Sequence, residues 1–223
     1  MTSPAPRYDA PPPEPRPECE YVGPMSYEAY RAYAERADVR LEYVDGVVYA
    51  VQTGTSVHGL IATNAVARLR ALVRGTGCRA YQSNFAVRTP RGNEYVPDVL
   101  VTCGPQPPAR AHATDAPCVL VEVLSPSTAR VDLSEKRYAY REIPTLGTYL
   151  VVESEWRAVH HHWRDAGGVW QEQTVVGEGA VALACPAGAA ITLGEIYEEL
   201  DLPAAPPPPR LPTLRRVREP EPV

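Results

Sequence analysis

The chain has 223 residues, 44% hydrophobic residues and a formal net charge of −5, which is enough for one domain with a proper core. The negative charge argues against a protein that coats DNA non-specifically, although a bound metal or a local basic patch can still supply a positive field. The sequence has no apolar run long enough to span a membrane and no hydrophobic signal core at its N-terminus, so we expect no membrane partner.

Prolines mark the two ends of the chain. Of the 25 prolines, 8 fall in residues 1–24 and 8 in residues 203–223. Extended, proline-rich segments of this kind do not build a packed core. We therefore predict a disordered tail over residues 1–22, a single domain over residues 23–202 and a second disordered tail over residues 203–223.

The five cysteines form no CxxC pair, and their number is odd. This favours unpaired thiols in a reducing compartment over a disulfide framework, so we expect a cytoplasmic protein. The spacing of Cys103, His112 and Cys118 also differs from that of a common zinc motif.

The first third of the domain predicts a helix, a hairpin and a second helix. A helix over residues 26–36 is followed by two strands that meet at Asp45-Gly46, which is a strong signal for a two-residue turn. Apolar residues then recur at helical spacing over residues 56–74. His58 lies at the beginning of this second helix, where the plainer interpretation is a capping or partly buried histidine.

Two predicted buried strands in the middle of the chain each carry a carboxylate, Asp98 within residues 96–102 and Glu122 within residues 118–124. Burying a carboxylate is costly unless a cation or hydrogen bonds compensate for it. Residues 103–116 predict a loop, so the two strands are expected to pair antiparallel and to bring the carboxylates together. Such a pair suits Mg²⁺ or Mn²⁺. For Asp98 alone, a buried aspartate that caps a turn is the plainer alternative.

The residues after Glu122 predict a helix that Ser127-Thr128 caps and that runs to about residue 142. Asp132, Lys136 and Tyr140 are spaced four residues apart and therefore share one face of this helix. The plainer interpretation is a solvated Asp–Lys pair worth a few tenths of a kcal/mol. Because the helix begins beside Glu122, the lysine can instead lean back over the carboxylates.

The last third predicts a strand over residues 148–153, a hairpin that turns at Gly167-Gly168, and a helix over residues 193–200. In the first strand of that hairpin, His160 and His162 point to one face and can chelate Zn²⁺ or Ni²⁺, but exposed strand histidines are the favoured interpretation. These elements together predict an α/β fold with a mixed central sheet.

The pattern resembles the Uma2 family of proposed endonucleases, which belongs to the PD-(D/E)XK nuclease superfamily. The resemblance covers about residues 23–202 and is carried by Tyr27-Glu28, the segment Leu41-Glu42-Tyr43-Val44-Asp45-Gly46-Val47-Val48-Tyr49, His58, Val96-Pro97-Asp98-Val99, Glu122-Val123-Leu124-Ser125-Pro126-Ser127-Thr128, Asp132, Lys136 and Tyr140. It implies a restriction-endonuclease-like mixed central sheet flanked by helices, with an additional β-hairpin region.

The resemblance also implies roles for individual residues. Asp98, Glu122 and Glu42 are expected to bind Mg²⁺, for which Mn²⁺ can substitute. Lys136 is expected to replace the lysine that normally stands two residues after the second acid, a position that Leu124 fills here. His58 and Tyr140 are expected beside these residues. Without the resemblance, the alternation of residues around Glu42 puts it on the exposed face of its strand.

The expected function is a Mg²⁺-dependent endonuclease that hydrolyses phosphodiester bonds of nucleic acid, with DNA as the first expectation and a homodimer as a further one. The alternative is a catalytically inactive protein with the same fold that binds nucleic acid or a protein. The candidate basic patch for nucleic acid consists of Arg68, Arg70, Arg74, Arg79, Arg88 and Arg91; an ordinary solvated surface is the plainer interpretation of these arginines.

Overall fold

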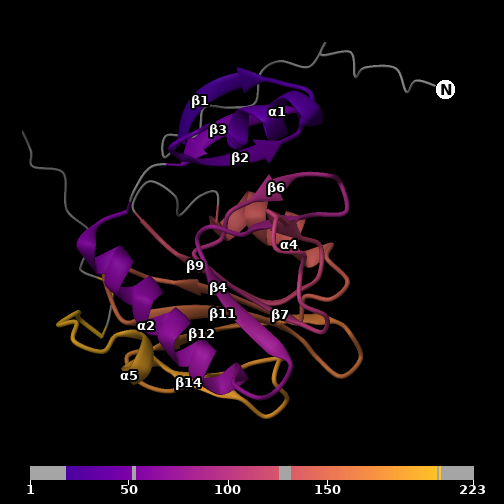
Figure 1. The fold of residues 1–223 in the computed structure, drawn as a ribbon. Coiled ribbons are helices and arrows are strands. Elements are labelled where there is room, and N and C mark those ends of the chain that lie inside the picture. Colours follow the sequence, from indigo (N-terminus) through magenta and orange to yellow (C-terminus); the bar gives the residue numbers. More distant parts are fainter. Residues whose placement is uncertain (1–18, 52–53, 126–131, 205, 207–223) are drawn as a thin grey trace, which may run out of the picture.

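The computed structural model describes residues 19–51, 54–125, 132–204 and 206. Most of the two predicted tails and the predicted helix cap at residues 127–128 lie outside these ranges. Figure 1 shows a small sheet with α1 against it at the top of the molecule, and a larger sheet with α2 below. No helix in the described ranges is both long and apolar enough to cross a membrane.

The first sheet combines the N-terminal hairpin with short strands from the middle of the chain. Its order is β1 (Cys19–Pro24), β3 (Val47–Val51), β2 (Arg40–Val44), β6 (Glu94–Tyr95), β5 (Ala86–Arg88) and β8 (Ala113–Thr114). Asp45 and Gly46 have φ angles of 48° and 82°, and positive φ at both central residues is what the predicted two-residue turn requires. Helix α1 (Tyr27–Ala34) begins at the predicted place, because Ser26 accepts a hydrogen bond from the Ala29 N–H.

The second sheet is the mixed central sheet that the sequence predicts. Its order is β12 (Trp170–Val176), β11 (Ala158–Arg164), β10 (Thr148–Val152), β9 (Pro117–Val123), β7 (Val99–Cys103) and β4 (Cys78–Gln82). β9 pairs parallel with β10 and antiparallel with β7, so the predicted antiparallel pairing of the two carboxylate strands is confirmed. Strand β7 begins at Val99, three residues later than predicted, because the chain crosses from the first sheet to the second between Tyr95 and Val99.

The helices cover the central sheet on both faces. Helix α2 (Ser56–Val73) and the short α5 (Leu193–Ile196) pack on one face through a core that includes Ile61, Leu69 and Ile196. The other face packs against the π-helical turn η1 (Asp132–Lys136), α4 (Arg137–Arg141) and the first sheet. A two-stranded sheet of β13 (Ala180–Ala182) and β14 (Ala190–Thr192) completes the fold. The last helix is shorter than predicted, because its C-cap Tyr197 leaves the helical conformation.

The additional hairpin of β11 and β12 is present, but two of its histidines are not exposed as predicted. His161 is 2% exposed and His162 is 5% exposed. His162 stacks on Tyr149, and His161 stacks on Trp163. The prediction of exposed histidines is wrong for this pair because both faces of β11 are covered. His160 and His162 do share one face, since both line the same cavity of about 350 Å³.

The cysteines also differ from the prediction. Disulfides join Cys78 to Cys103 and Cys118 to Cys185. The expectation of unpaired thiols is therefore wrong for these four residues. Spacing along the chain did not indicate the pairing, because the partners are 25 and 67 residues apart.

The buried His161 makes the free energy of unfolding depend on pH. Burial lowers its pKa to about 4, whereas an unfolded histidine titrates near about 6.5. Between pH of about 4 and about 6.5 the unfolded chain binds a proton at this histidine and the folded chain does not. The stability that the neutral histidine contributes is therefore fully present above about pH 6.5 and is lost as the pH falls. When the pH falls from about 7.5 to about 5, the free energy of unfolding of the parent should decrease by about 2 kcal/mol more than that of His161→Gln. Urea unfolding at the two pH values measures this difference. An equal pH dependence of the two proteins would contradict this.

Candidate active site

Strand pairing places Asp98 directly beside the strand that carries Glu122. The Asp98 Oδ2 atom accepts a hydrogen bond of 2.8 Å from the N–H of Val123, the residue that follows Glu122 in β9. Asp98 itself stands just before β7, where the chain enters the central sheet. The antiparallel pairing of β7 and β9 therefore brings the two acids to the same end of neighbouring strands, as predicted.

Lys136 lies between two buried carboxylates. Its Nζ atom is 3.0 Å from Glu122 Oε1 and 3.3 Å from Glu42 Oε1. Glu42, Glu122 and Lys136 are only 1%, 4% and 8% exposed. Buried charges attract one another more strongly than charges at the surface do. Each of them can stay buried only because an opposite charge lies beside it. Lys136 thus contacts one acid from each sheet, Glu42 from the first sheet and Glu122 from the central sheet.

The burial of Glu42 contradicts the exposed position that its strand pattern alone predicts. Leu41 faces α1, and Glu42 faces the opposite way, toward the layer where the first sheet meets α4 and the central sheet. Both faces of the first sheet are covered, so alternation along β2 does not separate a buried face from a solvated one. The Oε1 atom of Glu42 also accepts a 3.2 Å hydrogen bond from the Val96 N–H.

Tyr140 orients Glu122 from the next helical turn. Its hydroxyl donates a 2.9 Å hydrogen bond to Glu122 Oε1, the oxygen that Lys136 also contacts. Burial, reinforced by the negative charge of Glu122, raises the pKa of Tyr140 well above its usual value, so the hydroxyl keeps its proton and acts as a donor. The shared contact confirms that Lys136 and Tyr140 lie on one face of the helix.

The helix that carries Lys136 is not the regular α-helix predicted. Its described part begins as the π-helical turn Asp132–Lys136 and becomes α-helical at Arg137. Turns of this kind are rare and are frequent at functional sites. Glu135 anchors the turn, since it accepts a 2.9 Å hydrogen bond from the hydroxyl of Tyr95 in the first sheet. The side chain of Asp132 lies outside the described part of the structure.

His58 contacts Asp98 from the first turn of α2. The His58 Nε2 atom is 3.1 Å from Asp98 Oδ2, and the backbone N–H of His58 is capped by the Thr55 hydroxyl. Burial raises the pKa of Asp98, but the hydrogen bond and charge of His58, the Val123 N–H and Lys136 outweigh it, so the pKa lies below its usual value. Asp98 is therefore ionised at neutral pH.

Two site residues were missed by the sequence analysis. The Arg40 Nη1 atom, on β2, is 4.0 Å from Asp98 Oδ1. Gly54 leaves room for the histidine, because a Cβ atom at this position would stand 2.6 Å from the His58 ring. Neither residue carried a usable signal, since an arginine in a half-buried strand and a glycine before a helix are both common.

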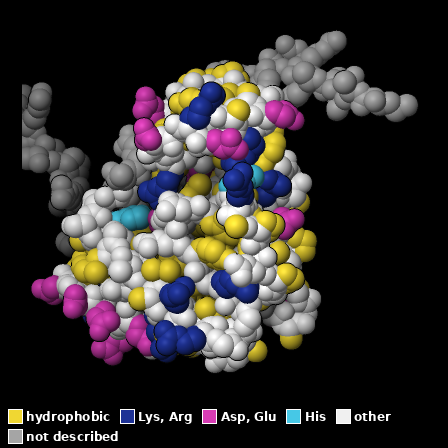
Figure 2. All heavy atoms as spheres, in the orientation of Figure 1, with side chains coloured by type: hydrophobic (Ala, Val, Ile, Leu, Met, Phe, Trp, Pro, Cys, Tyr) yellow, Lys and Arg dark blue, Asp and Glu magenta, His cyan; other side chains and the backbone are white. Residues whose placement is uncertain are grey.

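Most of the predicted arginine patch is engaged elsewhere. Arg68 pairs with Glu195, Arg88 with Glu94, and Arg91 with Glu142. Arg79 donates to the backbone carbonyls of Gly77 and Gly104. Figure 2 shows Lys and Arg side chains spread over the middle of one face of the molecule, while acidic side chains gather at the lower left over α5. Four of the six arginines are therefore held by partners within the chain.

The donor set suits a hard divalent cation. Asp98, Glu122 and Glu42 supply only carboxylate oxygens, and all three are less than a tenth exposed. Lys136 is the buried cation that faces them, with Arg40 at the edge. Carboxylate oxygens are the donors that Mg²⁺ and Mn²⁺ prefer, so these three residues could hold such an ion.

Comparisons with known proteins show which family the chain is similar to. The profile of the Uma2 family, described as "Putative restriction endonuclease", matches residues 27–194. The Synechocystis protein slr1290, described as uncharacterized, is 31% identical over 147 residues, which are 66% of this chain and 77% of that protein. A second Synechocystis protein, sll1609, also described as uncharacterized, is 27% identical over 158 residues, or 68% of this chain and 87% of that protein.

The chain is similar in fold to a solved structure. That structure is described as a putative nuclease belonging to DUF820 from Anabaena variabilis, with a TM-score of 0.59, 13% identity and coverage of 72% of this chain and 91% of that chain. This likeness supports the fold class predicted from the sequence, a mixed sheet flanked by helices. The profile match spans most of the domain and includes Glu42, His58, Asp98, Glu122 and Lys136. The chain therefore belongs to the Uma2 family, described as putative restriction endonucleases.

Proposed function

We propose that the chain is a divalent-metal-dependent endonuclease that hydrolyses phosphodiester bonds of nucleic acid, with DNA as the first substrate to test. The observation that carries this proposal is the position of Lys136, whose ammonium group lies 3.0 Å from Glu122 and 3.3 Å from Glu42 in a buried cluster beside Asp98. A lysine beside metal-binding acids suits a reaction that develops negative charge on a phosphate.

The proposed metal ligands are Asp98, Glu122 and Glu42. When bound, Mg²⁺ or Mn²⁺ would neutralise phosphate charge and lower the pKa of a bound water. The hydrogen bonds from Val123, His58 and Tyr140 hold two of these carboxylates in fixed orientations. Glu42 and Glu122 stand within strands and Asp98 stands directly before one, so the sheets fix the proposed ligands before substrate arrives.

Lys136 is proposed to act on the attacking water or on the phosphate. Its ammonium group contacts Glu42 and Glu122, which are also two of the proposed metal ligands. In that position it orients the attacking water or stabilises the negative charge that develops in the transition state. Tyr140, which keeps its proton, fixes Glu122 through the carboxylate oxygen that the lysine also contacts.

His58 is proposed as a positioning residue. It contacts Asp98 Oδ2 at 3.1 Å, and with the Val123 N–H it fixes the direction of that carboxylate. The alternative function, an inactive relative that binds nucleic acid or protein, would keep the same fold. Cleavage assays separate the two.

The activity prediction concerns the acid and the lysine. We expect the full chain to cleave supercoiled plasmid with Mg²⁺ or Mn²⁺ and not with EDTA, and Asp98→Asn and Lys136→Met each to lower the rate by about a hundredfold or more. Labelled single-stranded DNA and RNA, assayed in parallel, identify the substrate. Asp115→Asn, the same chemical change at an exposed loop residue, is the matched control and should retain the parent rate.

The outcomes separate three cases. Cleavage that survives in both variants points to a contaminating nuclease and contradicts the proposal. No cleavage of any substrate by the parent, together with Mn²⁺ binding that Asp98→Asn abolishes, would support the inactive relative. Absence of Mn²⁺ binding by the parent would refute the proposed metal site itself.

The stability prediction concerns the buried lysine. Lys136→Met leaves Glu42 and Glu122 buried without their ammonium partner, so we expect the free energy of unfolding in metal-free buffer to fall by about 3 kcal/mol. Arg137→Met is the control, because Arg137 pairs with Glu172, whose side chain is 57% exposed, and a surface pair is worth about 1 kcal/mol or less. Urea unfolding measures both. Equal losses in the two variants would show that the lysine does not compensate the buried acids.

A further inference from the structure

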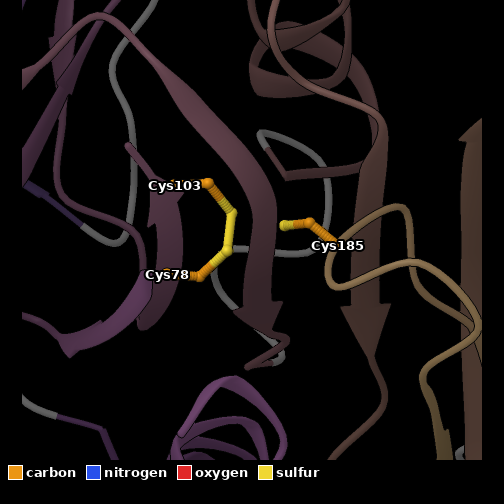
Figure 3. A group of neighbouring side chains, drawn as sticks. All are labelled: Cys78, Cys103 and Cys185. Atoms are coloured by element: carbon orange, nitrogen blue, oxygen red, sulfur yellow. A yellow bond between two sulfur atoms is a disulfide. The ribbon is translucent and has the colours of Figure 1, made fainter. Parts of the chain in front are cut away.

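We propose that Cys78, Cys103, Cys118 and Cys185, in their reduced state, form a tetrathiolate site for Zn²⁺. The Sγ atoms of Cys78, Cys103 and Cys185 lie within 4.8 Å of one another, and Cys103 Sγ is 3.5 Å from Cys118 Sγ. Figure 3 shows Cys78 and Cys103 joined by a disulfide, with the sulfur of Cys185 pointing toward that pair. Three sulfurs therefore lie together, and the fourth, that of Cys118, adjoins two of them.

The fold, and not a local sequence motif, creates this cluster. β9, β7 and β4 are consecutive strands of the central sheet, and Cys78 stands directly opposite Cys103 in the register of β4 and β7. Cys118 is near the beginning of β9, beside the end of β7. Three cysteines thus occupy the same end of three neighbouring strands.

The fourth cysteine is held over the sheet by packing. Cys185 follows Ala184, whose N–H donates a 2.8 Å hydrogen bond to the Thr148 hydroxyl. The neighbouring Gly147 packs closely on Ala184, because a Cβ atom at Gly147 would lie 2.4 Å from the Ala184 Cβ. The Gly147 N–H in turn donates to the Cys118 carbonyl oxygen. These contacts place Cys185 next to Cys118.

The separations suit a closed zinc site. Four thiolates at the usual Zn–S distance place their sulfurs about 3.8 Å apart at the corners of a tetrahedron. The separation of Cys103 and Cys118, 3.5 Å, is already close to that edge length. In the reduced protein, the sulfurs of each joined pair can reach the remaining corners by rotation of their side chains. Soft thiolate donors select Zn²⁺ over the hard cations that the carboxylate site suits.

Local charge favours a metal thiolate centre here. A zinc ion with four thiolates carries two negative charges. The Arg79 guanidinium donates to the carbonyls of Gly77 and Gly104, which are the chain neighbours of Cys78 and Cys103. A positive charge beside the cluster lowers the cost of forming thiolates.

The cluster is separate from the carboxylate site. Asp98 stands directly before β7 and Cys103 ends that strand, five residues later, or about 16 Å at the rise of a strand. A zinc ion here would tie the ends of three strands to the β13–β14 region. Its role would be structural, and the inference is independent of the proposed nuclease activity.

Reduction and metal binding balance as follows. Each disulfide takes two electrons from a phosphine reductant and two protons from a water, whose oxygen ends on phosphorus as the phosphine oxide. The four resulting thiols lose four protons when they bind one divalent cation. In the oxidised protein the sulfurs of these four cysteines are joined in pairs, so the cluster offers no thiolate.

The test uses Co²⁺, which reports its ligands in the absorption spectrum, on the full chain purified without a histidine tag. We expect the phosphine-reduced parent to bind about one equivalent of Co²⁺ with the sulfur-to-metal charge-transfer band and visible bands of a tetrahedral thiolate site, and Zn²⁺ to displace it. The oxidised parent should show no such band. Asp98→Asn should retain the band, because the carboxylate site offers no sulfur.

Two cysteine variants complete the test. Cys103→Ser/Cys118→Ser should lose the tetrahedral thiolate spectrum, and Cys19→Ser, a control in β1 of the other sheet, should retain it. If the double variant does not fold by circular dichroism, the reduced parent alone decides. A reduced, folded parent without the charge-transfer band, or a band unchanged in the folded double variant, would overturn the proposal and leave two disulfides as the only role of these cysteines.

Discussion

The contact of Lys136 with Glu42 and Glu122 is the constraint on which the rest of the structure depends. These three charges are almost fully buried, and their burial is tolerable only because they face one another. Glu42 comes from the first sheet, Glu122 from the central sheet and Lys136 from the helical segment between them. The contact therefore fixes how the two sheets and the helix are arranged.

The surrounding core supports this arrangement with aromatic residues. Tyr140 packs edge-to-face against Tyr95 of the first sheet and Tyr149 of the central sheet. The same tyrosine donates a hydrogen bond to Glu122. One side chain thus joins the apolar layer between the sheets to the polar site at its margin. Apolar packing excludes water from the carboxylates, and their hydrogen bonds in turn satisfy polar groups that the packing buries.

The sequence predicted those parts of the site that depend on neighbours along the chain or on one strand pairing. The turn at Asp45-Gly46 and the antiparallel pairing behind Asp98 and Glu122 follow from local patterns, and so does the shared face of Lys136 and Tyr140. Glu42 was different, because alternation shows which residues share a face but not what covers that face. The likeness to a family supplied what the pattern could not.

Other features depended on contacts between distant segments. His161 and His162 are buried because other elements cover both faces of β11, which the composition of the strand does not reveal. The cysteines meet because three strand ends coincide and a loop folds over them, and no spacing rule describes that. The contact of His58 with Asp98 depends on where α2 lies against the central sheet, which is set by the core around Ile61 and Leu69.

The crossing of the chain between the sheets ties the proposed chemistry to the completion of folding. Between Tyr95 and Val99 the backbone leaves the first sheet and enters the second, and Asp98 stands at the end of that passage. The central sheet alone would hold Asp98 and Glu122 but would lack Glu42, whose carboxylate lies 3.3 Å from the Lys136 ammonium group. The proposed site is therefore complete only when both sheets have formed.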